Sequence, residues 1–109
     1  LFRSRDQKKV FVITNRSVFS AANEFVKYMK QAPKATIIGD QTGGGAGMPF
    51  SSELPNGWSV RFSACPMYDI NKNSTEDGIQ PDIKCLMTMI DFYKGKDTCI
   101  EKARSIISD

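Results

Sequence analysis

The residues best suited to chemistry lie where an apolar run near the start of the chain gives way to a helical pattern. Residues 10–13 predict a buried strand, and Ser20 stands directly before Ala21 and Ala22, at the start of the helical pattern. At such a strand-to-helix turn, a serine hydroxyl lies beside unpaired backbone N–H groups and the positive end of a helix dipole. Those N–H groups can stabilise an oxyanion, so acyl-transfer enzymes place a nucleophile there. Ser20 is therefore a candidate nucleophile.

Ser20 has no conventional base within this sequence, because the chain contains no histidine. A plainer interpretation is that Ser20 is an ordinary helix N-cap, since serine is among the preferred capping residues. Ser17 lies one turn earlier and is a weaker candidate for the nucleophile. Capping and nucleophilic roles are compatible, so the residue types alone leave both open.

Four glycines occupy five consecutive positions at residues 43–47. A phosphate-binding P-loop requires lysine and then serine or threonine after the last glycine, with a helix beyond. Here Met48 and Pro49 follow instead and lead into a strand pattern, which disfavours phosphate binding. We expect a flexible loop beside a substrate groove.

The composition predicts one small globular domain of 109 residues, with 40% hydrophobic and 25% charged residues. No apolar run approaches the roughly 20 residues of a membrane span. The net charge of +3 comes from basic residues scattered among twelve acids, which does not favour nucleic-acid binding. Cys65, Cys85 and Cys99 lack metal-ligand spacing, so neither a metal nor a cofactor is expected. Two interpretations of the cysteines stay open: one disulfide bond, or three buried thiols.

The elements that would position Ser20 form a β-α-β unit. A helix is predicted over residues 19–31, where Phe25, Tyr28 and Met29 follow one another at i, i+3 and i+4 and give the helix an apolar face. Residues 35–39 predict a second short strand. Units of this kind pair their strands in parallel with a right-handed crossover.

The second half of the chain predicts a hairpin followed by helix. Residues 50–54 and 58–63 flank an Asn-Gly turn, which is a strong hairpin signal. Trp58 and Phe62 on this hairpin could line a peptide groove, but core burial is the default for such residues. A short helix is predicted at residues 87–92, and Asp97 is expected to cap a terminal helix with an apolar stripe of Ile100, Ala103, Ile106 and Ile107.

Five segments in order resemble the C-terminal half of the catalytic domain of the S41 serine peptidases. They read N-R-S-V-F-S-A-A-N-E, A-T-I-I-G-D-Q-T-G-G-G, L-P-N-G-W, E-D-G-I-Q-P-D-I and K-G-K-D-x-x-I-E-K-A, and they cover residues 8–108. The family includes the carboxyl-terminal processing proteases and the tricorn core protease. The resemblance implies an α/β fold with a ClpP/crotonase-like core, here a β-α-β unit, a hairpin and a C-terminal helix. It also implies that residues 1–109 are the C-terminal portion of a peptidase domain whose upstream half is absent.

The resemblance assigns roles to particular residues. Ser20 matches the family nucleophile, and the Ala21 N–H would be one oxyanion donor, with the second donor coming from an upstream glycine motif. Processing-type members take their base from a lysine in a G-x-T-x-G-K-G loop, but here Gly43, Gly44 and Gly45 form the loop and Gly45 occupies the lysine position. Glu76 matches the glutamate of the tricorn branch, in which an upstream histidine activates the serine.

The function that the resemblance implies is that of a serine endopeptidase working through an acyl-enzyme on Ser20. The substrate would be a peptide or protein bound as an added strand, and the site of action would be periplasmic or at the cell surface. We expect the isolated 109-residue chain to be inactive, and its exposed sheet edge to favour pairing with another copy. A non-catalytic module that binds peptides or hydrophobic ligands is the alternative; a crotonase-like acyl-CoA enzyme fits Ser20 and the G-I-Q-P-D segment less well.

Overall fold

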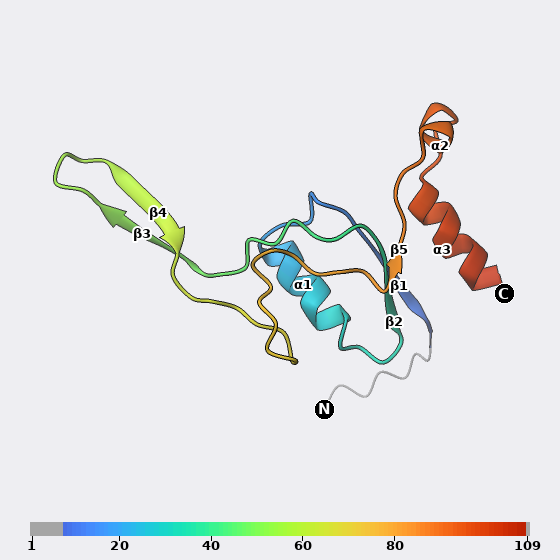
Figure 1. Ribbon diagram of the computed structural model, residues 1–109, viewed down its shortest axis with the longest axis horizontal. Helices are drawn as coiled ribbons and strands as arrows, with labels where there is room; N and C mark the ends of the chain where they lie inside the picture. The colour runs from blue at the N-terminus through green and yellow to red at the C-terminus, as the bar shows by residue number, and fades with distance from the viewer. Residues whose placement is uncertain (1–7, 109) are drawn as a thin grey trace.

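A three-stranded parallel sheet forms the centre of the molecule (Figure 1). The computed structural model describes residues 8–108. Strands β1 (Val10–Thr14), β2 (Ala35–Gly39) and β5 (Ile83–Lys84) lie in the order β1-β2-β5. Val10 pairs with Ala35 and the register continues without a break to the end of both strands. The predicted parallel β-α-β unit is confirmed.

Helix α1 (Ala21–Met29) connects β1 to β2, lies beside the sheet (Figure 1) and contacts β2. Val26 packs with Ile37 of β2 and with Ile79, a cluster joined by half-buried apolar residues. The helix is shorter than the predicted 19–31, because Ser20 has a backbone conformation that a helix cannot include and turns replace the helix after Met29.

The apolar face expected for α1 is covered only in part, because Met29 packs against the Val26 cluster while the two aromatic residues lie largely exposed. Phe25 and Tyr28 are 54% and 63% exposed, whereas the buried positions are Asn23, Val26 and Lys27. The buried stripe is thus offset from the aromatic stripe, and α1 buries a polar side chain where the periodicity favoured aromatic ones.

The predicted hairpin forms but projects away from the sheet (Figure 1). Strands β3 (Pro49–Glu53) and β4 (Ser59–Ser63) pair antiparallel, and the rings of Phe50 and Phe62 meet across them at a centroid distance of 5.8 Å. Core burial of Trp58 and Phe62 was the wrong expectation, since these side chains are 71% and 52% exposed.

Two helices end the chain, α2 (Met89–Tyr93) and α3 (Thr98–Ser108). Asp97 caps α3 as predicted, because its Oδ1 accepts the N–H groups of Cys99 and Ile100 at 2.8 and 3.0 Å. Helix α3 contacts β1 and β2. Its predicted stripe is only partly covered: Ala103 is buried, while Ile107 is 64% exposed.

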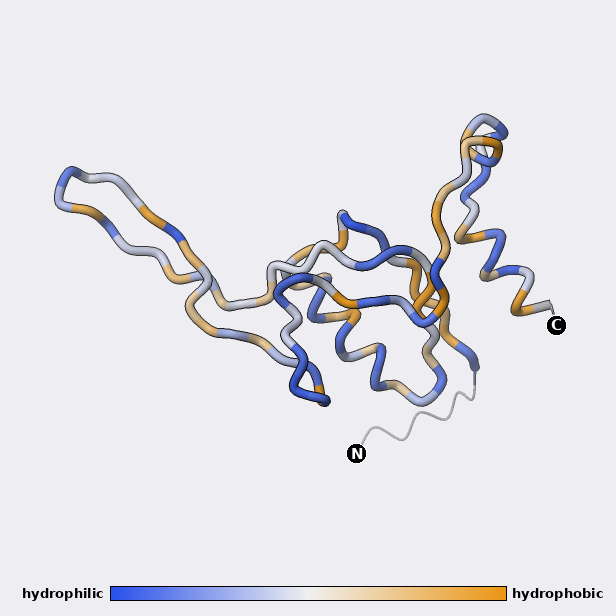
Figure 2. Tube along the Cα trace, in the orientation of Figure 1, coloured by the Kyte–Doolittle hydropathy of each residue, from blue (hydrophilic) through white to orange (hydrophobic). Residues whose placement is uncertain are grey.

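The overall shape is more open than that of a self-contained domain. The Cα radius of gyration is 17.6 Å, compared with about 13 Å for a compact domain of this length. Apolar stretches lie on the projecting hairpin as well as in the sheet (Figure 2). Within residues 8–108, no helix is long and apolar enough to cross a bilayer.

Candidate active site

Ser20 lies in a strained turn between β1 and α1. Its φ and ψ are 57° and −121°, a conformation that costs a non-glycine residue about 1–3 kcal/mol and is enriched at functional sites. Hydrogen bonds on both sides hold it: the Ser20 N–H donates to Gly44 O at 2.8 Å, and Ser20 O accepts the Glu24 N–H at 3.1 Å. This sharp strand-to-helix turn has the geometry of a nucleophile elbow.

The Ser20 hydroxyl does not act as a helix cap. Ser20 occupies the N-cap position of α1, but its side chain makes no capping hydrogen bond. The side chain is also exposed. The structure therefore does not support the interpretation of Ser20 as a capping residue, because a capping side chain stabilises a helix only through a hydrogen bond to a helix N–H.

Ala21 is the first residue of α1, where a helix N–H has no acceptor within the helix. Within residues 8–108 the Ala21 N–H donates no backbone hydrogen bond, whereas the next N–H, that of Ala22, is held by Phe19 O at 3.2 Å. It stands at the N-terminus of α1, where the helix dipole favours negative charge. This is the position predicted for one oxyanion donor.

The glycine loop is clamped between two other segments and is not the flexible loop expected from its composition. The Gly43 N–H donates to Val18 O at 2.8 Å, Gly44 O accepts the Ser20 N–H, and the Gly45 N–H donates to Glu76 O at 2.9 Å. A Cβ on Gly44 would lie 1.9 Å from Glu76 O, so the loop and the Glu76 segment can approach this closely only because residue 44 is glycine.

Ser20 and Glu76 line one cavity of about 430 Å³. Glu76 Oε1 lies 3.4 Å from the Ser63 hydroxyl of β4, and the Glu76 side chain is exposed to this space. Of the three glycines predicted for the substrate loop, Gly45 lines the cavity. The remaining wall residues come from the turn, the glycine loop and the hairpin: Phe19, Gly47, Pro49, Arg61, Phe62 and Ser63. A second cavity, of about 460 Å³, lies between α1 and residues 69–80 and contains neither Ser20 nor Glu76.

A buried polar layer lies beneath the site and was not predicted. The Thr42 hydroxyl donates to Asn23 Oδ1 at 2.6 Å and accepts the Ile79 N–H at 2.6 Å, and Asn23 Nδ2 donates to Thr75 O at 3.0 Å. Asn23 and Thr42 are completely buried. The only signal in the sequence is that Asn23 lies three residues before Val26, which places a polar residue on the buried face of the helix.

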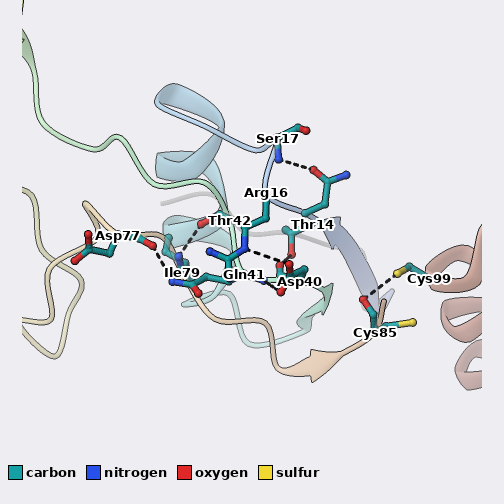
Figure 3. A network of polar contacts seen from close by, with 11 residues as sticks. Thr14, Arg16, Ser17, Asp40, Gln41, Thr42, Asp77, Ile79, Cys85 and Cys99 are labelled. Carbon is teal, nitrogen blue, oxygen red and sulfur yellow. Dashed lines mark hydrogen bonds and ion pairs between the residues drawn. The ribbon is translucent and has the colours of Figure 1, made fainter. Parts of the chain in front are cut away.

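Polar contacts at the start of the glycine loop extend this arrangement (Figure 3). Asp40 pairs with Arg16 at 3.2 Å and accepts the Gln41 N–H at 2.8 Å, and the Gln41 side chain donates to Asp77 O at 2.7 Å. The Gln41 N–H, with the Arg16 guanidinium, lowers the pKa of Asp40 below the usual carboxyl value. Gln41 thereby connects the loop to the residue after Glu76.

The three cysteines are free thiols in different surroundings. Cys65 is exposed, Cys85 is half-buried, and Cys99 is buried with its Sγ donating to Cys85 O at 3.3 Å (Figure 3). Burial raises the pKa of the Cys99 thiol to about 12, so this thiol stays protonated and unreactive at neutral pH. In the part of the chain that the structure describes, no group of three or more His, Cys, Asp or Glu side chains could hold a metal ion.

Residues 3–85 match the model of peptidase family S41. The chain belongs to this family. A protein of Parabacteroides merdae ATCC 43184 described as a candidate peptidase is 55% identical, with a TM-score of 0.89 over 97% of this chain and 34% of that one. Mature CPAF in complex with lactacystin is 24% identical, with a TM-score of 0.83 over 93% of this chain and 20% of that one. The tricorn protease is 23% identical, with a TM-score of 0.78 over 91% of this chain and 10% of that one.

These similarities confirm the fold predicted from the sequence, an S41 chain with a ClpP/crotonase-like core. The S41 chain spans about a third of the length of the Parabacteroides protein and a smaller share of the others.

The position of the family lysine in this S41 chain cannot hold a side chain without a rearrangement. Gly45 has a φ of +68°, and a Cβ there would lie 2.1 Å from a ring carbon of Phe19. A lysine would therefore require both a strained backbone and a displaced aromatic ring. The Ser–Lys arrangement of processing-type members has no counterpart at this position.

Proposed function

We propose that this chain carries the nucleophile of a serine endopeptidase. The observation that supports this most is the strained Ser20 turn, whose side chain makes no capping hydrogen bond and which lines a cavity together with Glu76. The Ser20 Oγ would attack a peptide carbonyl and pass its proton to a base. Collapse of the tetrahedral intermediate, with its oxyanion on the Ala21 N–H, breaks the C–N bond and protonates the amine that leaves. Water then hydrolyses the acyl-enzyme.

Glu76 is proposed to support the base and not to replace it. Its carboxylate is exposed at the cavity wall and contacts the Ser63 hydroxyl. A carboxylate in that place can orient an imidazole and stabilise its charged form. The sequence has no histidine, so the imidazole would come from a segment outside residues 1–109, as would the second oxyanion donor. On this proposal residues 1–109 are the C-terminal portion of a larger catalytic domain, and alone they hydrolyse no peptide.

A peptide or protein substrate is proposed to bind in extended form beside the hairpin. Membership of a peptidase family implies protein substrates. Arg61, Phe62 and Ser63 of β4 form one wall of the cavity that holds Ser20, and an extended peptide can add to the edge of a hairpin through its backbone. Gly45 would form the opposite side of the groove, held in place by Gly43 and Gly44, which do not line the cavity.

Action outside the cytoplasm is proposed by analogy with the family, and fractionation of cells expressing the complete gene product would test it. For the isolated 109-residue chain, association of copies is proposed through an exposed edge of the sheet, whose edge strands are β1 and β5. Sedimentation of the purified 109-residue chain would test this association.

Labelling with a fluorophosphonate probe tests the proposed nucleophile. In the complete gene product we expect stoichiometric labelling, with the adduct mapped to Ser20 by mass spectrometry and lost in Ser20→Ala. Ser17→Ala is the matched control, because Ser17 is also exposed and lies just before the same turn. Its labelling should equal that of the unmodified protein. Labelling that survives Ser20→Ala would refute the proposal.

A second candidate function is peptide binding without cleavage, favoured by Gly45 in place of the family lysine. It predicts no labelling of Ser20 together with saturable binding of peptides, measured by fluorescence anisotropy. Binding unchanged in Ser20→Ala would then support the binding module.

A further inference from the structure

The candidate site is assembled from three separate segments that meet in two layers. They are the turn at Ser20, the glycine loop and the segment that carries Glu76. The upper layer consists of backbone hydrogen bonds alone: Ser20 N–H to Gly44 O, and Gly45 N–H to Glu76 O. Three of the four residues that form those bonds, Ser20, Gly45 and Glu76, line the cavity. These two hydrogen bonds alone do not fix the positions of the three segments relative to one another.

The lower layer joins the same three segments through buried side chains. Asn23 follows Ser20 by three residues on α1, Thr42 directly precedes Gly43, and Thr75 directly precedes Glu76. Each buried polar residue is therefore a near neighbour in the chain of one site residue. Asn23, Thr42 and Thr75 are at most 2% exposed.

The hydrogen-bond directions in this layer are uniquely determined. Thr75 O, the carbonyl that precedes Glu76, can only accept, so the Asn23 Nδ2 group faces it and Asn23 Oδ1 faces Thr42. Thr42 Oγ1 therefore donates its proton to Asn23 Oδ1 and accepts the Ile79 N–H, which can only donate. Each of these buried polar side chains has a hydrogen-bond partner. Removal of the Thr42 hydroxyl would leave Asn23 Oδ1 and the Ile79 N–H buried without that partner, which destabilises the folded chain.

We propose that Thr42 and Asn23 are positioning residues that set the placement of Ser20 relative to Glu76. This inference rests on the proposed function. It goes beyond that function because neither residue lines the cavity or touches a reacting atom. A shift of the Glu76 segment against α1 displaces the carboxylate from the serine, and displacements of about 1 Å can slow catalysis about a hundredfold.

Two substitutions at Thr42 separate positioning from stability. Thr42→Val keeps the shape of the side chain but removes the hydroxyl, and Thr42→Ser keeps the hydroxyl but removes a buried methyl group. Both should lower the melting temperature. We expect Thr42→Val to slow fluorophosphonate labelling of Ser20 in the complete gene product by about ten- to a hundredfold, and Thr42→Ser to slow it less than threefold.

Thr14→Val is the matched control. Thr14 is also 2% exposed, and its hydroxyl donates to Asp40 O at 2.9 Å, an acceptor that belongs neither to the Ser20 turn nor to the Glu76 segment. It should lower the melting temperature without slowing the labelling. Equal slowing in Thr42→Val, Thr42→Ser and Thr14→Val would overturn the inference, because general destabilisation would then explain all three.

Amide hydrogen exchange distinguishes failure of this inference from failure of the proposed function. The Ser20 and Gly45 amides, which donate the two bonds of the upper layer, should exchange about tenfold faster in Thr42→Val and at the original rate in Thr14→Val. If Ser20 is never labelled but exchange changes in this way, the peptidase proposal fails and the positional coupling stands. If exchange at both amides is unchanged in Thr42→Val, the inference is refuted whatever the labelling shows.

Discussion

The two walls of the candidate site are built in opposite ways. The wall that holds Ser20 and the glycine loop rests on the sheet, on α1 and on completely buried residues such as Ile37, Asn23 and Thr42. The hairpin wall consists of β3 and β4, whose residues are all exposed. Hydrogen bonds join these strands to each other and to a few loop residues. The wall that holds Ser20 is therefore the better packed of the two, and it positions the proposed nucleophile. The hairpin wall is suited to be covered by another segment or a ligand, because among residues 8–108 its aromatic residues form one ring pair and otherwise lie exposed.

The largest difference between the walls is expected from truncation of apolar side chains. Ile37→Ala removes a completely buried side chain and should lower the free energy of unfolding by about 2–5 kcal/mol. Phe62→Ala removes a half-exposed ring and should cost about 1 kcal/mol or less. Urea denaturation monitored by circular dichroism measures both. Equal costs would show that the hairpin is as well packed as the sheet.

Alanine substitution of one glycine in each wall compares how closely the two walls are packed. Gly44 and Gly57 both have positive φ, and a Cβ on Gly44 would meet Glu76 O at 1.9 Å, while one on Gly57 would meet nothing within 4 Å. Gly57→Ala should therefore cost only backbone strain, about 1 kcal/mol. Gly44→Ala adds a backbone clash and should cost about 1–3 kcal/mol more. Differential scanning calorimetry of the two variants gives the difference, and the comparison fails if Gly57→Ala is the more damaging.

The smallest expected effect is electrostatic. The Gln41 N–H and Arg16 lower the pKa of Asp40 in the folded chain, so Asp40 contributes stability above its unfolded pKa of about 3.8. That contribution is lost as the pH falls through the lower folded value. Asp40→Asn should therefore lower the melting temperature slightly at pH 6 and less at pH 3. A melting temperature reduced equally at both pH values would mean that the ionised carboxylate contributes nothing.

The sequence predicted helices, strands and turns correctly where the residues of one segment alone determine its structure. The apolar runs of β1 and β2 with a helix between them favour a parallel pair, and the structure confirms this pairing. The Asn-Gly turn predicted the hairpin, and Asp97 was recognised as a cap from its place before α3. The family resemblance, drawn from ordered motifs, is confirmed over residues 3–85.

Burial was predicted less well, because periodicity reports which residues share a face and not what covers that face. Phe25 and Tyr28 share a face of α1 as expected, yet within residues 8–108 that face has little cover, and Trp58 on the hairpin is equally exposed. The glycine loop was expected to be flexible because glycine favours mobility, but its backbone is held on both sides by hydrogen bonds that only the folded chain supplies.

The sequence by itself determined the order of elements, the family and the candidacy of Ser20, Ala21 and Glu76, since each depends on short motifs and neighbouring residues. Only the tertiary structure decided that Ser20 and Glu76 share one cavity, that the Ser20 hydroxyl is uncapped and that Asn23 and Thr42 connect the segments beneath it. The physical reason is that these features depend on packing between distant parts of the chain. The hydrogen bonds from Thr42 to Asn23 and from the Ile79 N–H to Thr42 have no local pattern in the sequence, because their partners meet only when α1, the glycine loop and the Glu76 segment come together in the folded chain.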